Sequence, residues 1–170
     1  MLYMIINLIK YYSFLCLIII PITISANNIN IPADEILEMP LPLPYNGDIY
    51  SENDIEIFLD SSIRKSKQPI IIFGGNWCPD CRILEGTLLL PTIKKYMIEH
   101  YEIMHVDVGR YDKNMTLMSY FKIPKEEGVP RVLVFDNKKN IINIESTKEW
   151  TTARDRKQQE IFNYFQALVQ

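Results

Sequence analysis

The sequence predicts an α/β domain in which a central mixed β-sheet is flanked by helices on both faces. Apolar residues recur at helical spacing in several segments, and short apolar or β-branched runs lie between those segments. Two such runs near the C-terminus are joined by a polar turn. Strands that alternate with helices form parallel pairs and a hairpin adds an antiparallel pair, so the sheet is expected to be mixed. The 170 residues, 48% of them hydrophobic, suffice for one domain with a sizeable core.

Local signals mark the first helix and the first strand. Ser51 has the properties of a helix N-cap, and the acidic residues Glu52 and Asp54 suit the first turn of a helix. The helical segment ends before residues 69–73 (P-I-I-I-F), a continuous apolar run that is typical of a strand buried on both faces. The apolar face of the helix consists of Ile55, Phe58, Leu59 and Ile63.

Two helices are expected after this strand. The first begins at Cys78, after the turn at 74–76, and carries apolar residues at helical spacing. Pro91 removes a backbone donor, so Leu90 and Pro91 are expected to interrupt the helix. The second helix then covers residues 92–101.

The second half of the domain is expected to contain three strands and two helices. Residues 102–108 (E-I-M-H-V-D-V) alternate in polarity and are rich in β-branched residues, as a strand is. A polar turn at 136–140 separates two further apolar runs, which we expect to pair as a hairpin. The remaining elements are a short helix over 113–121, strands over 131–135 and 141–145, and a last helix that Thr151 or Thr152 caps.

The first 26 residues differ from the rest of the chain. Lys10 precedes a nearly continuous apolar run at 13–24, and small residues follow up to Ala26. This layout is typical of a secretory signal peptide that is cleaved after Ala26. The run is shorter than the roughly 20 residues of a spanning helix, but residues 2–9 are also apolar, so an uncleaved anchor is the alternative. We expect residues 1–26 to direct export to the periplasm or to tether the protein to the membrane.

Residues 27–50 form a second segment, which is rich in proline. Prolines remove backbone donors and fix backbone angles, so we expect an extended lead-in that packs on the domain or tethers it. Residues 51–170 then make up the folded domain. The prolines of the lead-in are Pro32, Pro40, Pro42 and Pro44.

The charge and the cysteine content argue against two kinds of role, nucleic-acid binding and a disulfide-stabilised scaffold. The formal net charge is −3 and no basic cluster stands out, so nucleic-acid binding is not expected. Of the three cysteines, Cys16 lies in the apolar N-terminal run, and cleavage would leave Cys78 and Cys81. A disulfide between residues three apart closes a very small loop and constrains the unfolded chain little, so a structural disulfide is not favoured.

The pattern W-C-P-D-C at 77–81 follows an expected strand and begins an expected helix. At a helix N-terminus, backbone N–H groups and the helix dipole favour the thiolate of Cys78, which is the reactive form. Cys81 lies one turn further along the same face. Cys78 can therefore attack a disulfide of another protein, and Cys81 can resolve the mixed disulfide. Trp77 is expected to cover one side of this site, and no cofactor is needed beyond the redox-active Cys78–Cys81 disulfide.

Metal binding is the main chemical alternative. Cys78, Cys81, His100 and His105 give a C-x2-C-x18-H-x4-H spacing, which is close to that of a zinc finger. However, His105 falls inside an expected strand and His100 at the far end of an expected helix, so no metal site is expected. A copper-handling protein that uses the two cysteines is a further alternative, although no Met or His ligand is obvious beside them.

From residue 52 to residue 168 the chain resembles a thioredoxin-fold domain. The resemblance is carried by W-C-P-D-C at 77–81, by G-V-P at 128–130 and by the order of the expected elements. It implies that Pro130 is cis and lies beside the two cysteines, and that Val129 offers its backbone to a client chain. The fold that it implies is a central mixed sheet flanked by helices.

A narrower resemblance is to exported bacterial thioredoxin-like proteins that are related to periplasmic thiol-reducing domains. It rests on C-R-I-L-E, L-L-L-P-T-I and H-V-D-V-G-R-Y-D-K-N. Asp107 and Asn114 match this pattern, and we expect Asp107 to shape the turn after its strand and Asn114 to cap the next helix. The chain departs from thioredoxins proper, which carry a buried Asp where this chain has Ile72. Asp80, Asp107 or water would then have to take the proton of Cys81.

Pro79 and Asp80, the two residues between the cysteines, bear on the direction of electron flow. A carboxylate near Cys78 opposes the thiolate and raises the pKa of Cys78 by like-charge repulsion. The couple should then be more reducing than a strong oxidant, whose thiolate is stabilised. We therefore expect an exported thiol–disulfide oxidoreductase that reduces client proteins and receives electrons from a membrane thiol donor. A non-enzymatic adaptor or chaperone with the same fold is the alternative.

Overall fold

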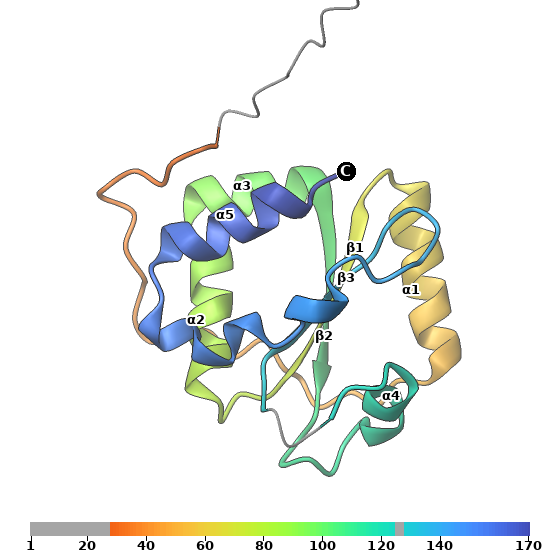
Figure 1. The fold of residues 1–170 in the computed structure, drawn as a ribbon. Helices are drawn as coiled ribbons and strands as arrows, with labels where there is room; N and C mark the ends of the chain where they lie inside the picture. The colour runs from red at the N-terminus through yellow and green to blue at the C-terminus, as the bar shows by residue number, and fades with distance from the viewer. Residues whose placement is uncertain (1–27, 125–127) are drawn as a thin grey trace, which may run out of the picture.

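The computed structural model describes residues 28–124 and 128–170. Its α-helices are α1 (Glu52–Arg64), α2 (Pro79–Leu88), α3 (Pro91–His100), α4 (Met115–Tyr120) and α5 (Gln158–Leu168), and its 3-10 helices are η2 (Ile144–Ser146) and η3 (Glu149–Asp155). Figure 1 shows a central sheet with α2, α3 and α5 on one side and α1 and α4 on the other. The predicted α/β architecture, a mixed sheet flanked by helices on both faces, is confirmed.

The sheet has three strands in the described part of the chain. They are β1 (Gln68–Gly74), β2 (Tyr101–Asp107) and β3 (Arg131–Val134), in the spatial order β2-β1-β3. The central strand β1 pairs in parallel with β2 and antiparallel with β3, so that Ile70 lies opposite both Ile103 and Val134. A strand that is paired on both edges and covered on both faces requires a continuous apolar run. The apolar run after Gln68 meets this requirement.

Alternate residues of β1 point to opposite sides of the sheet and divide the core into two clusters. Ile71 and Phe73 pack with α1 and α4. Ile70 and Ile72 pack with α2, α3 and α5, together with the fully buried Trp150 of η3. The end of β1 is therefore held from both sides, and the cysteines follow directly after it.

Two helix boundaries follow local signals in the sequence. Ser51 caps α1 in a capping box, because its hydroxyl accepts from the Asp54 N–H at 3.2 Å while the Asp54 carboxylate accepts from the Ser51 N–H at 2.7 Å. Leu90 and Pro91 separate α2 from α3. Both predictions are confirmed.

The predicted strand over 141–145 is wrong. After β3 an isolated bridge forms at Ile141, and the chain then enters η2. The reason is Asn143, whose buried side chain lies against the free edge of β3. Its amide oxygen accepts from the Val134 N–H, and its amide nitrogen donates to the Val132 carbonyl, both at 2.8 Å. A side chain thus satisfies backbone groups that a fourth strand would have paired.

The predicted start of the last helix is also wrong. Thr151 and Thr152 lie inside η3, and Thr152 has backbone angles outside the helical range (φ −118°, ψ 26°). Helix α5 begins after Lys157, whose backbone is extended. The Thr151 hydroxyl donates to the Lys148 carbonyl at 2.9 Å, so it is used within a 3-10 turn and not at the start of the α-helix.

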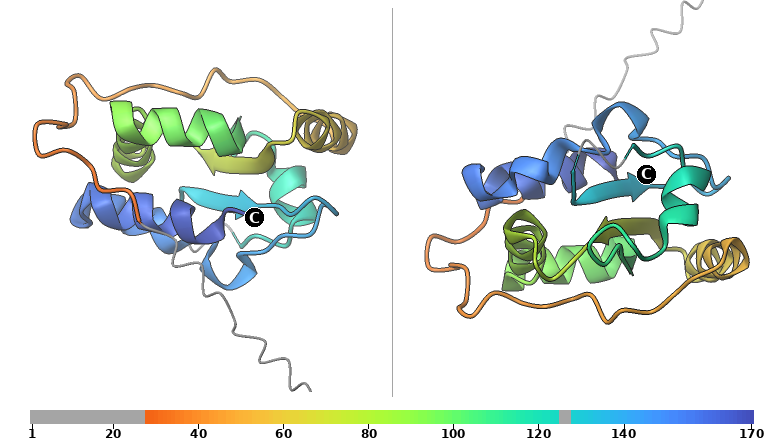
Figure 2. Two further views of the ribbon diagram at one scale, coloured as in Figure 1. Left: turned by 90° about the horizontal axis from the view of Figure 1, so that it is seen from above. Right: turned by 90° about the horizontal axis from the view of Figure 1, so that it is seen from below.

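The lead-in over 28–50 contains no helix or strand and runs along the outside of the domain (Figures 1 and 2). It is held there by side chains of the domain; for example, Arg82 of α2 donates to the Leu41 carbonyl at 2.7 Å. The predicted signal peptide, residues 1–26, lies outside the described residues. None of the helices in the described part of the chain has both the length and the apolar character of a membrane span.

Candidate active site

The two cysteines lie where β1 ends and α2 begins. Cys78 is the N-cap of α2, and its sulfur accepts a hydrogen bond from the Cys81 N–H at 3.2 Å. Pro79 occupies the first helical position, where its fixed φ suits the helix and no N–H is needed. Both cysteines are free thiols, and both are buried, with exposed fractions of 4% for Cys78 and 1% for Cys81.

The two thiols have different proton affinities. The pKa of Cys78 is lowered, chiefly by its hydrogen bond with the Cys81 side chain and also by the Cys81 N–H, while burial and the charge of Asp80 oppose the shift. The pKa of Cys81 is raised, first by burial and then by its hydrogen bond with Cys78 and by the charge of Cys78. Cys78 therefore ionises first, and a thiolate is the nucleophilic form of cysteine.

The loop before β3 lies across from Cys78. The Val129–Pro130 peptide bond is cis, and the Cys78 thiol donates to the Val129 carbonyl at 3.4 Å. Gly128 has a φ of 80°, a left-handed conformation that favours glycine. The fold thus brings together the two sequence motifs, 77–81 and 128–130.

An open groove runs past Cys78. Trp77, 38% exposed, stands at one side; its indole N–H donates to the Gly109 carbonyl, and the Arg110 guanidinium lies 5.2 Å from its ring centroid. Tyr111 meets Trp77 edge to face, with ring centroids 5.9 Å apart. The residues that line the groove are Trp77, Cys78, Pro79, Asp80, Tyr111, Gly128, Val129, Thr151 and Arg154.

Asp80 is an ion-paired residue, which the sequence did not reveal. Its side chain is 2% exposed, and Arg154 of η3 closes on it: the Arg154 N–H donates to Oδ1 at 2.9 Å, Nε donates at 3.0 Å, and Nη2 donates to Oδ2. The bonds with Asp80 and, more weakly, the charge of Cys78 raise the pKa of Arg154. The charge of Asp80 does oppose the Cys78 thiolate, as predicted, but the pKa of Cys78 is lowered on balance. The predicted effect of Asp80 is therefore present, and the hydrogen bonds from Cys81 at the start of α2 outweigh it.

Asp107 and Asn114 hold the turn after β2. The Asp107 carboxylate accepts from the Gly109 N–H at 2.7 Å, which agrees with the predicted role in the turn. Asn114 directly precedes α4, but its side chain makes no capping bond. Its oxygen instead accepts from the Tyr50 N–H at 2.9 Å, and its amide donates to the Asp107 carbonyl at 2.8 Å. The predicted capping role of Asn114 is wrong; its side chain ties the lead-in to the turn.

Comparisons with known proteins agree with this fold. The thioredoxin-like family matches residues 54–137. A crystal structure of a disulphide isomerase from Xylella fastidiosa Temecula1 is similar, with a TM-score of 0.66 and 28% identity over 75% of this chain and 98% of that chain. The chain has a thioredoxin-like fold. A protein of unknown function from Pseudomonas aeruginosa has a TM-score of 0.41 and 16% identity over 64% of this chain and 70% of that chain. No curated protein matches the chain.

Thioredoxins proper carry a buried Asp at the position of Ile72, and in this chain that position is apolar. Ile72 is 1% exposed and packs in the core on the α2 side of the sheet. Asp80 faces Arg154 and Asp107 faces the turn, so these carboxylates are engaged elsewhere. The lead-in brings Tyr45 to this sulfur instead: the Tyr45 hydroxyl and the Cys81 sulfur lie against the same backbone at Gly74, and Tyr45 acts to lower the pKa of Cys81. Sequence reasoning missed Tyr45 because no spacing or motif connects it to the cysteines.

The residues of the zinc alternative have other partners. His105 Nε2 lies 2.7 Å from Glu85 Oε2, and the ring of His100 lies 4.3 Å from that of Tyr96. Over residues 28–124 and 128–170, no group of three or more His, Cys, Asp or Glu side chains is placed to hold a metal ion together.

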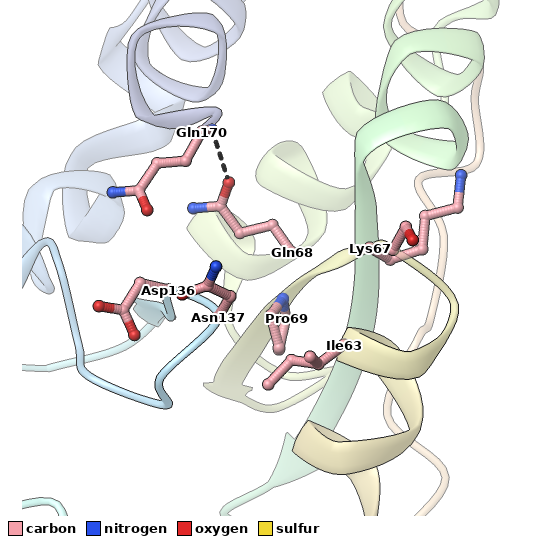
Figure 3. Close-up of a pocket in the computed structure, with 8 residues that line it drawn as sticks. Ile63, Lys67, Gln68, Pro69, Asp136, Asn137 and Gln170 are labelled. Carbon is pink, nitrogen blue, oxygen red and sulfur yellow. Dashed lines mark hydrogen bonds between the residues drawn. The ribbon is translucent and has the colours of Figure 1, made fainter.

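A separate pocket lies at the start of β1, away from the cysteines at its other end (Figure 3). Gln68 and Pro69 line it together with Asp136 and Asn137 of the turn after β3. The Gln170 N–H donates to Gln68 Oε1 at 3.1 Å across its rim. None of the residues that line it is a cysteine, so it is not part of the thiol site.

Proposed function

We propose that this protein is an exported thiol–disulfide oxidoreductase that reduces disulfides in client proteins through Cys78 and Cys81. One observation carries the proposal. The Cys78 sulfur has a lowered pKa, sits at the start of α2, and opens onto a groove beside the Val129 carbonyl. A thiolate in this position can attack a disulfide that lies in the groove.

The reaction has two exchange steps. In the first, the Cys78 thiolate attacks one sulfur of a client disulfide; a Cys78–client bond forms, the client S–S bond breaks, and the released client sulfur takes a proton. In the second, Cys81 loses its proton and attacks Cys78, which forms the Cys78–Cys81 disulfide and releases the second client thiol. Two electrons pass from the protein dithiol to the client. A membrane thiol donor then returns two electrons to the disulfide.

The groove supports binding of an extended client segment. We expect its main chain to lie against Val129 and Pro130, as in recognition by β-strand addition. Trp77 supplies an exposed aromatic surface beside Cys78. Main-chain recognition depends little on client sequence, so the protein should accept disulfides of several clients.

Reduction is favoured by the charges around Cys78. Strong oxidants of this fold stabilise the thiolate of their first cysteine. Here the Asp80 carboxylate and burial both oppose the Cys78 thiolate, and Asp80 is paired with Arg154. The reduced form is therefore stabilised less than in a strong oxidant, and the couple is expected to donate electrons.

Disulfide isomerisation is the second candidate, because the similar protein from Xylella fastidiosa Temecula1 is described as a disulphide isomerase. Isomerisation needs Cys78 to attack a wrong disulfide and to leave again, without net transfer of electrons. A Cys81→Ser variant would therefore keep isomerase activity and lose net reduction.

Insulin reduction tests the proposal. The wild-type protein, recycled by a small dithiol, is expected to precipitate the insulin B chain faster than the dithiol alone, and Cys78→Ser is expected to add nothing to that background. Refolding of a scrambled disulfide protein by Cys81→Ser then separates isomerisation from reduction. If the wild type and Cys78→Ser are indistinguishable in both assays, the chain is an adaptor or chaperone and not an oxidoreductase.

Export is tested separately by the mass of the protein purified from its own cells. Cleavage after Ala26 would give a mature chain that begins at Asn27, recovered with the periplasmic fraction. A membrane-bound chain that keeps Met1 would support the anchor instead. A full-length chain in the cytosolic fraction would contradict export.

A further inference from the structure

Tyr45 brings a buried hydroxyl from the lead-in to the back of the thiol pair. It is 5% exposed and belongs to the same core cluster as Cys78 and Cys81. Asn76, in the loop between β1 and α2, clamps its main chain: the Tyr45 N–H donates to Asn76 Oδ1 at 3.1 Å, and Asn76 Nδ2 donates to the Tyr45 carbonyl at 2.6 Å. The lead-in is therefore fixed to the loop that carries the cysteines.

Gly74, the last residue of β1, gives the Tyr45 hydroxyl room to meet Cys81. A Cβ at Gly74 would collide with the Tyr45 hydroxyl and would lie 2.8 Å from the Cys81 sulfur. Both groups thus lie against the same small stretch of backbone. The Tyr45 hydroxyl acts to lower the pKa of Cys81, against the larger opposing effect of burial.

The ionisable groups around this pair keep the Tyr45 hydroxyl protonated, so that it can act as a hydrogen-bond donor to Cys81. Burial, and then the charges of Cys81, Glu85 and Cys78, raise the pKa of Tyr45 well above its usual value, so its hydroxyl stays protonated. His105 of β2 meets the Tyr45 ring edge to face at 5.5 Å and lies 2.7 Å from Glu85. On the far side, burial and the charges of both cysteines raise the pKa of Tyr111.

We propose that the Tyr45 hydroxyl holds the thiolate of Cys81 during the second step of thiol–disulfide exchange. The inference rests on the proposed function and adds to it a residue outside the family match, which begins at residue 54. The redox site of this chain is therefore completed by its lead-in.

The step balances without a further reactant. In the mixed disulfide, the sulfur of Cys78 is bonded to the client and the thiol of Cys81 still carries its proton. As Cys81 attacks, the Cys78–Cys81 bond forms, the Cys78–client bond breaks, and the client sulfur leaves with the electron pair. The proton lost by Cys81 ends on the client sulfur. The Tyr45 hydroxyl donates to the negative charge that develops on Cys81 and keeps its own proton throughout.

A chromogenic aryl disulfide, dithiobis(nitrobenzoate), resolves the two steps. Attack by Cys78 releases one thionitrobenzoate, and attack by Cys81 on the resulting mixed disulfide releases the second. In Tyr45→Phe the first release is expected to keep its wild-type rate. The second is expected to slow about tenfold near neutral pH and to reach its half-maximal rate at a higher pH, because a hydrogen bond to a charged sulfur is lost.

Matched variants separate this role from simple packing. Tyr50→Phe makes the same change in the same lead-in, where the hydroxyl donates to Asp48 at 3.3 Å, and is expected to match the wild type in both phases. Cys81→Ser is expected to release only the first equivalent of thionitrobenzoate, because it lacks the thiol that attacks the mixed disulfide. Difluorotyrosine at position 45 keeps the ring and strengthens the donor, so it is expected to speed the second release; it also serves if Tyr45→Phe folds poorly.

Two results would overturn the inference in distinguishable ways. A wild-type protein that releases no thionitrobenzoate would overturn the proposed function and this inference with it. Two normal phases in the wild type, with the same second phase and the same pH profile in Tyr45→Phe, would overturn the role of Tyr45 alone.

Discussion

Asp80 and Arg154, 74 positions apart in the sequence, form an ion pair beside the Cys78 sulfur. The Asp80 side chain is almost fully buried, and a buried carboxylate requires a charged partner with good hydrogen bonds. Arg154 meets this requirement from η3, a 3-10 helix that packs on α2. The pair places one negative and one positive charge next to the thiolate, so each of them acts on the reactivity of Cys78.

Arg154→Gln is expected to raise the pKa of Cys78. The substitution removes a cation near the thiolate and leaves the repulsion by Asp80 unopposed. Alkylation of Cys78 at neutral pH should slow by roughly threefold to tenfold, since one pKa unit changes the thiolate fraction by up to tenfold. The measurement is the rate of reaction with iodoacetamide as a function of pH.

Asp80→Asn is expected to act in the opposite direction, because it removes the like charge that opposes the Cys78 thiolate. The pKa of Cys78 should fall further and the reduction potential should become more oxidising. The double variant, Asp80→Asn with Arg154→Gln, should lie nearer to the wild type than either single variant. If the double variant instead has the same pKa of Cys78 as Asp80→Asn alone, Arg154 does not act on the thiolate.

The wild-type thiols should differ in their pH dependence. A cysteine is alkylated as the thiolate, so its rate rises as the pH increases through its own pKa. The lowered pKa of Cys78 places this rise at a lower pH than for a free thiol, whereas the raised pKa of Cys81 keeps Cys81 protonated and unreactive over the same range. Mass spectrometry of the alkylated protein should find the label on Cys78. Label shared equally between the two cysteines would be incompatible with the environments described above.

Asn143→Ala is expected to destabilise the fold by about 1–3 kcal/mol, because it leaves the Val134 N–H and the Val132 carbonyl without their partner at a buried sheet edge. The free energy of unfolding from denaturant titration measures the loss. Asn137→Ala, in the exposed turn nearby, is the control and should change stability by less than about 0.5 kcal/mol. Equal stabilities for the two variants would show that the edge of β3 does not depend on Asn143.

Local sequence patterns predicted most of the fold. The apolar run of β1, the capping box at Ser51 and the break at Pro91 each depend on residues within a few positions of one another. The segment after β3 could not be predicted in this way, because an isolated bridge and η2 stand where a hairpin was expected. The run at 141–145 has the composition of a strand. However, the side chain of Asn143 bonds to the backbone groups at the edge of β3 that a further strand would have paired. The spacing of apolar residues does not indicate that a side chain will replace a strand in this way.

The parts of the candidate site that lie in short sequence motifs could be predicted. The motifs at 77–81 and 128–130 both lie at the groove, and the geometry of α2 follows from Cys78 and Pro79. Arg154 and Tyr45 could not be predicted, because each reaches the thiol pair from a segment that is distant in sequence and lacks regular spacing relative to it. Their proximity exists only after η3 and the lead-in have packed on the domain.

Trapping clients with Cys81→Ser would decide whether Cys78 performs exchange in the cell. The variant cannot complete the second step, so it should accumulate mixed disulfides that run as larger species on a non-reducing gel and disappear when a thiol reductant is added. The same chain with both cysteines replaced by Ser should accumulate none. If Cys81→Ser also accumulates none, while the protein is folded and present at normal levels, Cys78 does not exchange disulfides with client proteins.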